Sequence, residues 1–344
     1  FGAFIVRSGI IDSVHAFAND PDRGLYLLGF IGLIIFVSVF LFISRLSIIK
    51  SLSRIKKFSK QSYISINNIF FGALIFSVML GVTYPLIYEF LFDQKISVGA
   101  PFYNAIFIPI VFIAAVFLIF SVDSKWSRSI NFRPISAPIF FSILMSLTFT
   151  LFVMQYFESQ NISILASIFA GSLIISRYIY EIINSILNKK FINPFSVLAH
   201  MSLGLLIISI SFNSLLSSER ALSIGINSTE LYKDLKISFK DIGMKKNSNY
   251  DSIQATFIVE DQSGKTFNLK PEKRRYFTRG QITTETAIHA TVLRDIYITI
   301  GDQLDDGNWI VNVQINYLIR WIWLSALLMG FAGIILVVSN RVKT

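Results

Sequence analysis

Long apolar runs separated by short polar segments make up most of this chain. A helix needs about 20 apolar residues to cross a bilayer. Runs of this kind lie at 25–46, 69–91, 104–122, 135–154, 162–184, 194–216 and 319–340. The pattern predicts seven complete transmembrane helices. Residues 1–11 are also apolar, and we interpret them as the end of an eighth span whose beginning is missing from a fragment.

A different pattern occupies residues 217–318, which are mostly polar. Apolar and polar residues alternate at 235–242, 252–259, 295–300 and 309–315, a period typical of half-buried strands. The sequence therefore predicts an all-α polytopic membrane protein with a small β-rich domain. The expected divisions are a transmembrane region with an outer His15 loop (1–216), the β-rich domain (217–318), and a final helix with its tail (319–344).

The composition supports an integral membrane protein. Of 344 residues, 53% are hydrophobic and 33 are phenylalanine, and the mean hydropathy is +0.60. No soluble core of this size needs so much apolar surface.

The basic residues predict the orientation of the spans. The loop after the first complete span contains no acid and carries Arg45, Lys50, Arg54, Lys56, Lys57 and Lys60. The positive-inside rule makes this side cytoplasmic, or the matrix side in a mitochondrion, so the β-rich domain is expected to be periplasmic or to face the intermembrane space. That domain has thirteen basic and thirteen acidic residues, so the net charge of +10 resides elsewhere. The charge is thus a topology signal, and we expect no nucleic-acid partner.

Several kinds of chemistry have no support in the sequence. The chain has no cysteine, which excludes disulfides, thiol exchange and iron–sulfur ligation by its own residues. It also has no P-loop, nucleophile elbow or closely spaced zinc-binding histidines. These absences argue against a hydrolase and against an ATP-driven pump, and they assign any thiol chemistry to a partner.

His200 is the first candidate functional residue, because it lies about two turns inside the span 194–216. An ionisable side chain within hydrocarbon is costly, and imidazole is a good iron ligand. The structural alternative is a hydrogen bond to a carbonyl or hydroxyl of a neighbouring helix. Gly204, four residues later, leaves room either for a flat macrocycle or for a closely packed helix.

The other two histidines lie outside the predicted spans. His15 belongs to a polar outer loop with Asp12 and Asp20, and it could either ligate iron from the outer compartment or simply be solvated. His289 lies in the β-rich domain, and we interpret it as structural or solvated.

Two groups of charged residues also allow functional interpretations. The basic cluster from Lys270 to Tyr276 could bind haem propionates, or it could be a charged strand edge that discourages aggregation. Arg177 and Glu181 are four residues apart near the end of a span and are expected to form an ion pair.

Colinear segments throughout the chain resemble one protein family. They lie at 6–24, 95–104, 198–200, 250–253, 271–274, 284–288, 294–297, 305–310 and 320–324. In this order they resemble the C-terminal half of the CcmF family, the haem lyase component of cytochrome c maturation. The resemblance covers nearly the whole chain.

The resemblance implies a function and a set of ligands. A protein of this family positions and ligates haem for covalent thioether attachment to apocytochrome c. His15 would be an outer axial ligand of a transient substrate haem, and His200 would be an axial ligand of an internal haem b. The second histidine of each pair, and a tryptophan-rich haem platform, would belong to the preceding N-terminal half.

The resemblance also implies partners and a location. The partners would be the N-terminal half, a CcmE-like haem chaperone, a CcmH-like thiol-presenting protein and apocytochrome c. The expected location is the bacterial inner membrane, with the mitochondrial inner membrane as the alternative. Two other functions remain open at this point: a haem or small-molecule transporter or channel subunit, and a module that only docks partners through its β-rich domain.

Overall fold

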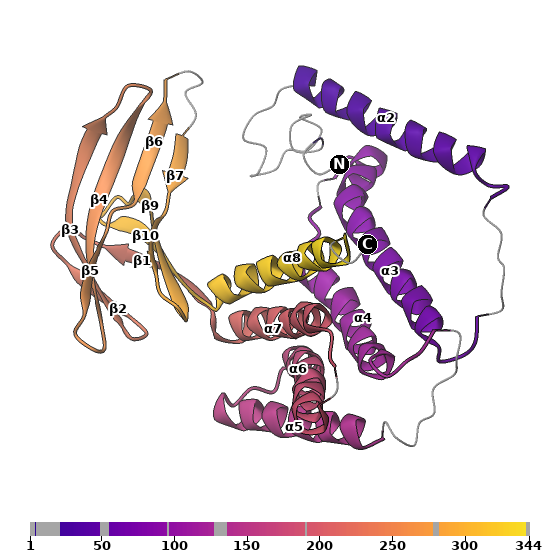
Figure 1. Cartoon of the computed structure of the whole chain (residues 1–344). Helices are drawn as coiled ribbons and strands as arrows, with labels where there is room; N and C mark the ends of the chain where they lie inside the picture. The colour runs from indigo at the N-terminus through magenta and orange to yellow at the C-terminus, as the bar shows by residue number, and fades with distance from the viewer. Residues whose placement is uncertain are drawn as a thin grey trace. The chain divides into compact units, whose positions relative to one another are not determined.

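The predicted membrane spans are helices in the structure. The computed structural model describes residues 4, 21–48, 55–94, 96–126, 136–189, 191–277 and 282–341. Seven helices among them are long and apolar enough to cross a membrane. They are α2 (Pro21–Ser44), α3 (Lys60–Phe92), α4 (Ala100–Ser121), α5 (Ser136–Tyr156), α6 (Ile162–Asn188), α7 (Pro194–Leu216) and α8 (Ile319–Arg341) (Figure 1). All seven predicted spans are confirmed, and the chain is a multi-pass membrane protein. The expected eighth-span end at 1–11 falls almost wholly outside the described residues.

Helix α3 begins nine residues before the predicted apolar run. Ser59 caps it by accepting a hydrogen bond from the Ser62 backbone N–H over 3.3 Å, and the Lys60 N–H bonds the Lys125 carbonyl over 3.0 Å. Its 33 residues give a length of about 50 Å, against about 30 Å for the hydrocarbon core. The apolar pattern predicted only the part of the helix that matches a bilayer.

The chain forms two compact units, Phe1–Ile139 and Phe140–Thr344. In the first unit α3 packs against α4 through aromatic contacts, since the rings of Tyr63 and Phe70 both meet Phe117 edge-on. In the second unit α6 packs against α7, and α7 against α8. Serine hydroxyls join α5 to α6, where the Oγ atoms of Ser146 and Ser176 lie 3.1 Å apart.

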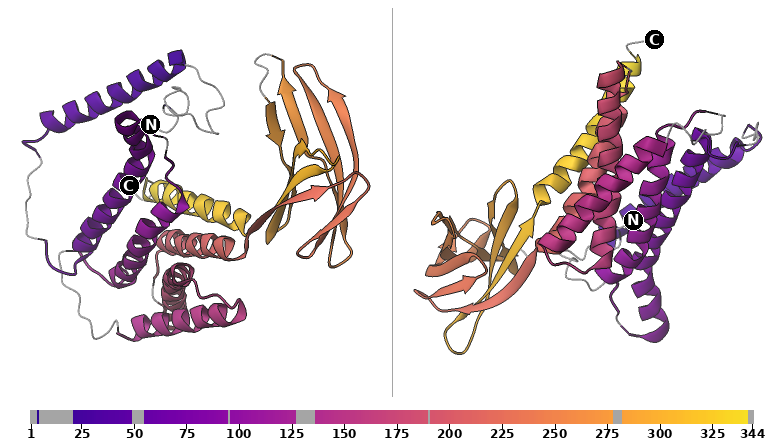
Figure 2. Two further views of the ribbon diagram at one scale, coloured as in Figure 1. Left: turned by 180° about the vertical axis from the view of Figure 1, so that it is seen from behind. Right: turned by 90° about the horizontal axis from the view of Figure 1, so that it is seen from below.

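The β-rich domain lies between α7 and α8 in the chain and consists of two antiparallel sheets (Figures 1 and 2). One sheet has the order β1 (Ser218–Ile224), β10 (Trp309–Tyr317), β9 (Arg294–Gln303) and β8 (Ala287–Ala290). The other has the order β2 (Thr229–Tyr232), β3 (Leu235–Lys246), β4 (Tyr250–Asp261), β6 (Glu272–Tyr276) and β7 (Ile282–Glu285), and β5 (Thr266–Leu269) also pairs with β4. The four strands predicted from alternation correspond to β3, β4, β9 and β10.

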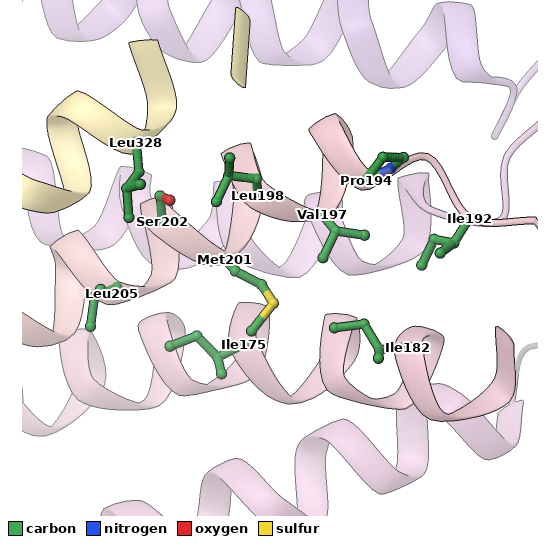
Figure 3. Close-up of a pocket in the computed structure, with 10 residues that line it drawn as sticks. All are labelled: Ile175, Ile182, Ile192, Pro194, Val197, Leu198, Met201, Ser202, Leu205 and Leu328. Carbon is green, nitrogen blue, oxygen red and sulfur yellow. The ribbon is translucent and has the colours of Figure 1, made fainter. Parts of the chain in front are cut away.

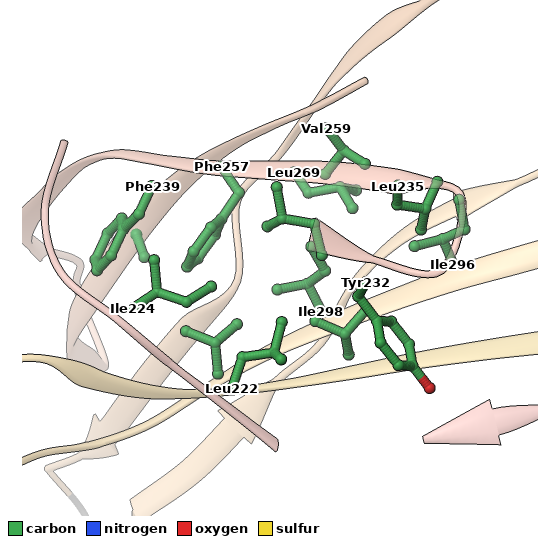
Figure 4. Packing of buried hydrophobic residues seen from close by; sticks show 14 of the residues in the cluster. Leu222, Ile224, Tyr232, Leu235, Phe239, Phe257, Val259, Leu269, Ile296 and Ile298 are labelled. Atoms are coloured by element: carbon green, nitrogen blue, oxygen red, sulfur yellow. The ribbon is translucent and has the colours of Figure 1, made fainter. Parts of the chain in front are cut away.

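Alternating side chains of the two sheets form one hydrophobic core (Figure 4). On β3, Leu235, Ile237 and Phe239 are fully buried while the residues between them are more exposed. The Phe239 ring stacks on that of Phe257 at a centroid distance of 4.6 Å. Burial of each such side chain contributes about 1.5–3 kcal/mol, so the alternation selects which face of each strand turns inward.

Polar contacts fasten the β domain to its two flanking helices. The Asn213 Oδ1 atom at the end of α7 accepts hydrogen bonds from the Tyr317 N–H over 3.1 Å and from the Ser217 hydroxyl over 2.7 Å. Trp321 of α8 donates its indole N–H to the Val292 carbonyl over 3.0 Å. The first and last strands, β1 and β10, are paired, so the domain begins and ends at one place.

Candidate functional site

Helix α7 carries His200 and begins where the sequence supplies a strong cap. The Asn193 Oδ1 atom accepts hydrogen bonds from the N–H groups of Phe195 and Ser196, over 3.0 and 3.4 Å. Pro194 occupies the first turn, where its missing N–H costs nothing. The apolar run that follows keeps the helix continuous to Leu216, so His200 is held on a regular helix within a membrane-length segment.

Contacts within α7 and with α6 orient the half-buried His200 ring. Its Nδ1 atom lies 2.7 Å from the Ser196 carbonyl oxygen, one turn earlier on the same helix. Its ring also stacks on that of Tyr178 from α6, with centroids 5.1 Å apart and planes 7° from parallel. The contact with the neighbouring helix is thus an aromatic stack, whereas this carbonyl hydrogen bond lies within α7.

The hydrogen bond determines the tautomer of His200. A carbonyl oxygen can only accept, so Nδ1 carries the hydrogen and donates it. In the neutral ring the lone pair then resides on Nε2. Histidines that ligate metals usually donate their other ring N–H to a carbonyl or carboxylate in this way. The donor chemistry of His200 therefore fits an axial iron ligand.

Gly204 serves the close approach of two helices. A Cβ atom built there would lie 2.8 Å from the Gly171 carbonyl oxygen, and one built on Gly171 would lie 2.9 Å from the Gly204 carbonyl oxygen. The backbones of α6 and α7 thus cross at this pair of glycines. Of the two sequence interpretations of Gly204, room for a helix is the one that the structure supports.

The predicted ion pair on α6 is confirmed. The Arg177 Nη1 atom lies 2.6 Å from the Glu181 Oε1 atom. The Arg177 side chain is 0% exposed, which is deeper burial than its place near the end of a span suggested. Arg177 precedes Tyr178, so a fully buried arginine with a partly exposed carboxylate partner lies next in sequence to the aromatic partner of His200.

An apolar cavity of about 530 Å³ lies among α6, α7 and α8 (Figure 3). Its walls include Val197, Met201 and Leu205, which recur every four residues along one side of α7. Ser202, which is 3% exposed, contributes a hydroxyl to this wall. His200 and Gly204 belong to a different side of the helix.

The predicted outer ligand, His15, lies outside the described residues. Its environment, and the distance between it and His200, are therefore not part of the described structure. Among the described residues, no group of three or more His, Asp or Glu side chains could hold a metal ion by itself.

His289 packs as a structural side chain in the β domain. It lies on β8, and its ring stacks on that of Phe267 with centroids 3.8 Å apart and planes 13° from parallel. Burial lowers the pKa of His289, and the charges of Lys265 and Arg294 lower it further. The ring is therefore held in its neutral form within a packed contact.

The basic cluster 270–276 lies inside a sheet. Strand β6 pairs with β4 on one side and β7 on the other, so the interpretation as a charged strand edge is wrong. Arg274 forms ion pairs with Glu272 over 2.9 Å and with Glu285 over 3.5 Å, and Lys273 pairs with Asp302. Arg274 and Lys273, two of the candidate ligands for haem propionates, are thus already paired with carboxylates of the domain.

Sequence reasoning missed the partners of His200. Tyr178 lies 22 positions earlier on another helix, and a single sequence gives no signal for which residues of two helices meet. The Ser196 carbonyl could have been anticipated, because residues four apart face each other on a helix.

Comparisons with known proteins agree with this fold. A family model described as the CcmF C-terminal beta-sandwich matches residues 215–317. The cytochrome c-type biogenesis protein CcmF of Pseudomonas aeruginosa is 28% identical over 351 residues, covering 99% of this chain and 53% of that protein. CcmF of Escherichia coli is 29% identical over 346 residues, with the same coverage of both chains. The chain spans about half the length of the curated relatives it matches.

One solved structure extends the likeness to the helices. It is titled "Cytochrome c Heme Lyase CcmF" and has a TM-score of 0.66, with 15% sequence identity, over 87% of this chain and 49% of that one. At this identity the likeness shows a shared fold of membrane helices and β-sandwich.

Proposed function

We propose, from the premise that this chain belongs to the CcmF family and corresponds to its C-terminal half, that it is a component of a cytochrome c haem lyase. The complete protein would position haem for covalent thioether attachment to apocytochrome c. The residues of this chain would contribute axial ligation and orientation, which is the usual division of labour between scaffold and cofactor.

His200 is the proposed axial ligand of an internal haem b. The observation that carries this assignment is the hydrogen bond from Nδ1 to the Ser196 carbonyl, which leaves the lone pair on Nε2. The Tyr178 ring restricts rotation of the imidazole about its Cβ–Cγ bond, because the two rings are nearly parallel. A haem b held there would supply a one-electron redox centre. The opposite ligand would come from the N-terminal half.

His15 is the proposed outer ligand of the substrate haem. This assignment rests on the family resemblance of residues 6–24, because the residue lies outside the described part of the chain. A CcmE-like chaperone would deliver the haem, and a CcmH-like protein would present the thiols, since this chain has no cysteine. We place the complex in the bacterial inner membrane, with residues 217–318 as one periplasmic domain.

Replacement of His200 by Ala in the complete protein tests the inner ligand. The expected result is loss of the internal haem, measured as absorbance and as iron per protein. The matched control is His289→Ala, which removes the same side chain from the β domain and should leave the haem in place. Full haem content in the His200→Ala protein would refute this assignment.

Tyr178 provides a test of positioning. Tyr178→Phe keeps the stacked ring and should retain the haem spectrum, whereas Tyr178→Leu removes the ring and should broaden the low-spin absorbance bands. Equal spectra for the two variants would show that the stack does not orient the ligand.

The outer ligand requires a separate assay. His15→Ala should abolish capture of chaperone-borne haem and lower the yield of mature cytochrome c, while the internal haem remains. Retention of both capture and yield would refute the role of His15. Haem uptake into sealed vesicles without thioether formation would instead support the transporter alternative.

A further inference from the structure

The two sheets of the β domain differ in length, so part of one inner face has no opposing sheet. Phe239 of β3 is 0% exposed, whereas Met244, farther along the same face of the strand, is 87% exposed. The opposing sheet ends near Asp302 of β9, which pairs with Lys273 of β6. Beyond this contact β3, β4 and β6 continue past the strands of the opposing sheet (Figure 1).

The strand register defines which residues share this uncovered inner face. One row across the sheet joins Met244, Ile253, Lys273 and Thr284. The next row joins Lys246, Asp251, Arg275 and Ile282. A bulge between Phe239 and Asp241 shifts β3 by one residue, which is why Met244 and Lys246 continue the inward face.

The uncovered inner face combines exposed apolar side chains with positive charge. Met244 and Ile282, at 87% and 59% exposure, flank the half-buried Ile253. Such exposure of large apolar side chains in a water-facing domain is typical of an interaction site, and methionine suits surfaces that adapt to a partner.

The charges on this face indicate what kind of partner it fits. Lys246 and Arg275 are exposed, and among the described residues no carboxylate lies within ion-pair distance of either. Asp251 lies between them in the register, so basic residues outnumber acidic ones on this face. An acidic partner gains complementary charge here, and a basic one is repelled.

We propose that the uncovered inner face, comprising Met244, Lys246, Ile253, Arg275 and Ile282, is a docking surface for a partner polypeptide that presents apolar side chains among acidic ones. The apolar residues supply buried area at the centre, and the two cations select the sign of the partner's charge. This surface is independent of the haem ligands and does not rest on the haem lyase function.

Binding of designed peptides to the complete protein in detergent tests the proposal. The probe is a synthetic peptide that alternates Glu and Leu, compared with one of Lys and Leu and one of Glu and Ser. The Glu–Leu peptide should bind at least about tenfold more tightly than either of the others. Charge reversal by Lys246→Glu with Arg275→Glu should remove this preference. The matched control is Lys240→Glu with Arg220→Glu, which reverses two exposed charges elsewhere on the domain and should leave it intact.

Residues 1–344 contain no cysteine, so a single introduced cysteine permits a second test at the same surface, with the unmutated complete protein as the labelling blank. Met244→Cys should react rapidly with a polar maleimide in the complete protein and become protected when the Glu–Leu peptide is added. Leu231→Cys, at a site 71% exposed on β2, should react equally with and without peptide. A Met244→Cys protein that does not react without peptide would mean that the rest of the protein or a second copy covers this face, and it would overturn the proposal. Equal effects of the two charge reversals would overturn it as well.

Discussion

The α6–α7 helix pair and the β domain place polar groups in opposite ways. In the helix pair, polar side chains lie between the helices. Arg177 is 0% exposed, and the His200 ring of α7 stacks on the Tyr178 ring of α6. In the β domain the core is apolar, and charged residues such as Glu272 and Arg274 pair on the opposite face of a sheet. The two parts also pack differently, since glycine backbones meet in one and large side chains interlock in the other.

Because of this difference, a polar residue is stronger evidence for a functional site in the helix pair than in the β domain. Within an apolar span an ionisable group is an exception that needs a reason, which is why His200 is a strong candidate. In a water-facing domain a histidine or a basic cluster is ordinary, and the structure accounts for His289 and Arg274 by local contacts. The same residue type therefore carries different weight in the two parts.

The largest expected effect concerns the core of the β domain. Phe257→Ala removes a fully buried ring that stacks on Phe239 and should destabilise the domain by about 3–5 kcal/mol. Limited proteolysis of the complete protein should then cut within residues 217–318. Leu231→Ala, at an exposed site, should leave the cleavage pattern unchanged. Equal resistance of both variants would mean that the apolar core is not what stabilises this domain.

The next effect concerns the glycine crossing of the helix pair. Gly204→Leu forces side-chain atoms against the Gly171 carbonyl, and overpacking of this kind costs about 3 kcal/mol. The thermal midpoint in detergent should fall, and the haem content should fall with it. Gly330→Leu on α8 is the control, because nothing in the described chain lies within 4 Å of a Cβ atom there. Similar midpoints for the two variants would contradict the close crossing.

A smaller effect concerns the pH dependence of the β domain. Burial alone raises the pKa of Glu272, but the hydrogen bond and charge of Arg274 outweigh it, and the pKa lies below its ordinary value. A carboxylate of this kind stabilises the fold above its unfolded pKa of about 4.3, and that stability is lost as the pH falls through the lowered pKa. Glu272→Gln should cost about 2 kcal/mol at neutral pH and flatten the loss below pH of about 4. Urea unfolding at several pH values, with Glu219→Gln as control, measures this.

The smallest effect concerns His289. Its lowered pKa means that the fold favours the neutral ring, so stability is complete above a pH of about 6.5 and declines as the pH falls below it. His289→Gln should remove this decline and leave the stability above that pH nearly unchanged. Because no other histidine lies in residues 217–318, a decline that persists in the variant would have another origin.

The sequence predicted the helices well because a bilayer imposes a length and a uniform composition. The span 194–216 matches α7 residue for residue, while the polar start of α3 was missed. Long strands such as β3 and β4 show alternation, whereas the four-residue strands β2, β5, β7 and β8 are too short to show it. Strand β6 was not predicted because its charged residues show no apolar alternation, although it pairs with a strand on each side.

The candidate site was predictable only in part, because the pattern along one helix identifies an unusual residue but not its neighbours on other helices. His200 stands out from its own apolar run, so one residue could be chosen without knowing its neighbours. The stack on Tyr178 and the position of Gly171 against Gly204 depend on how two helices cross, which the order of residues along one helix does not contain.

Because β1 pairs with β10, the β domain can be exchanged as a unit between α7 and α8. Its entrance and exit are neighbouring strands, and Asn213 ties both to the end of α7. A different domain with adjacent termini could replace it without changing the distance between the end of α7 and the start of α8. The surface that the β domain presents to water can therefore change in evolution while the packing of α7 against α8 stays the same.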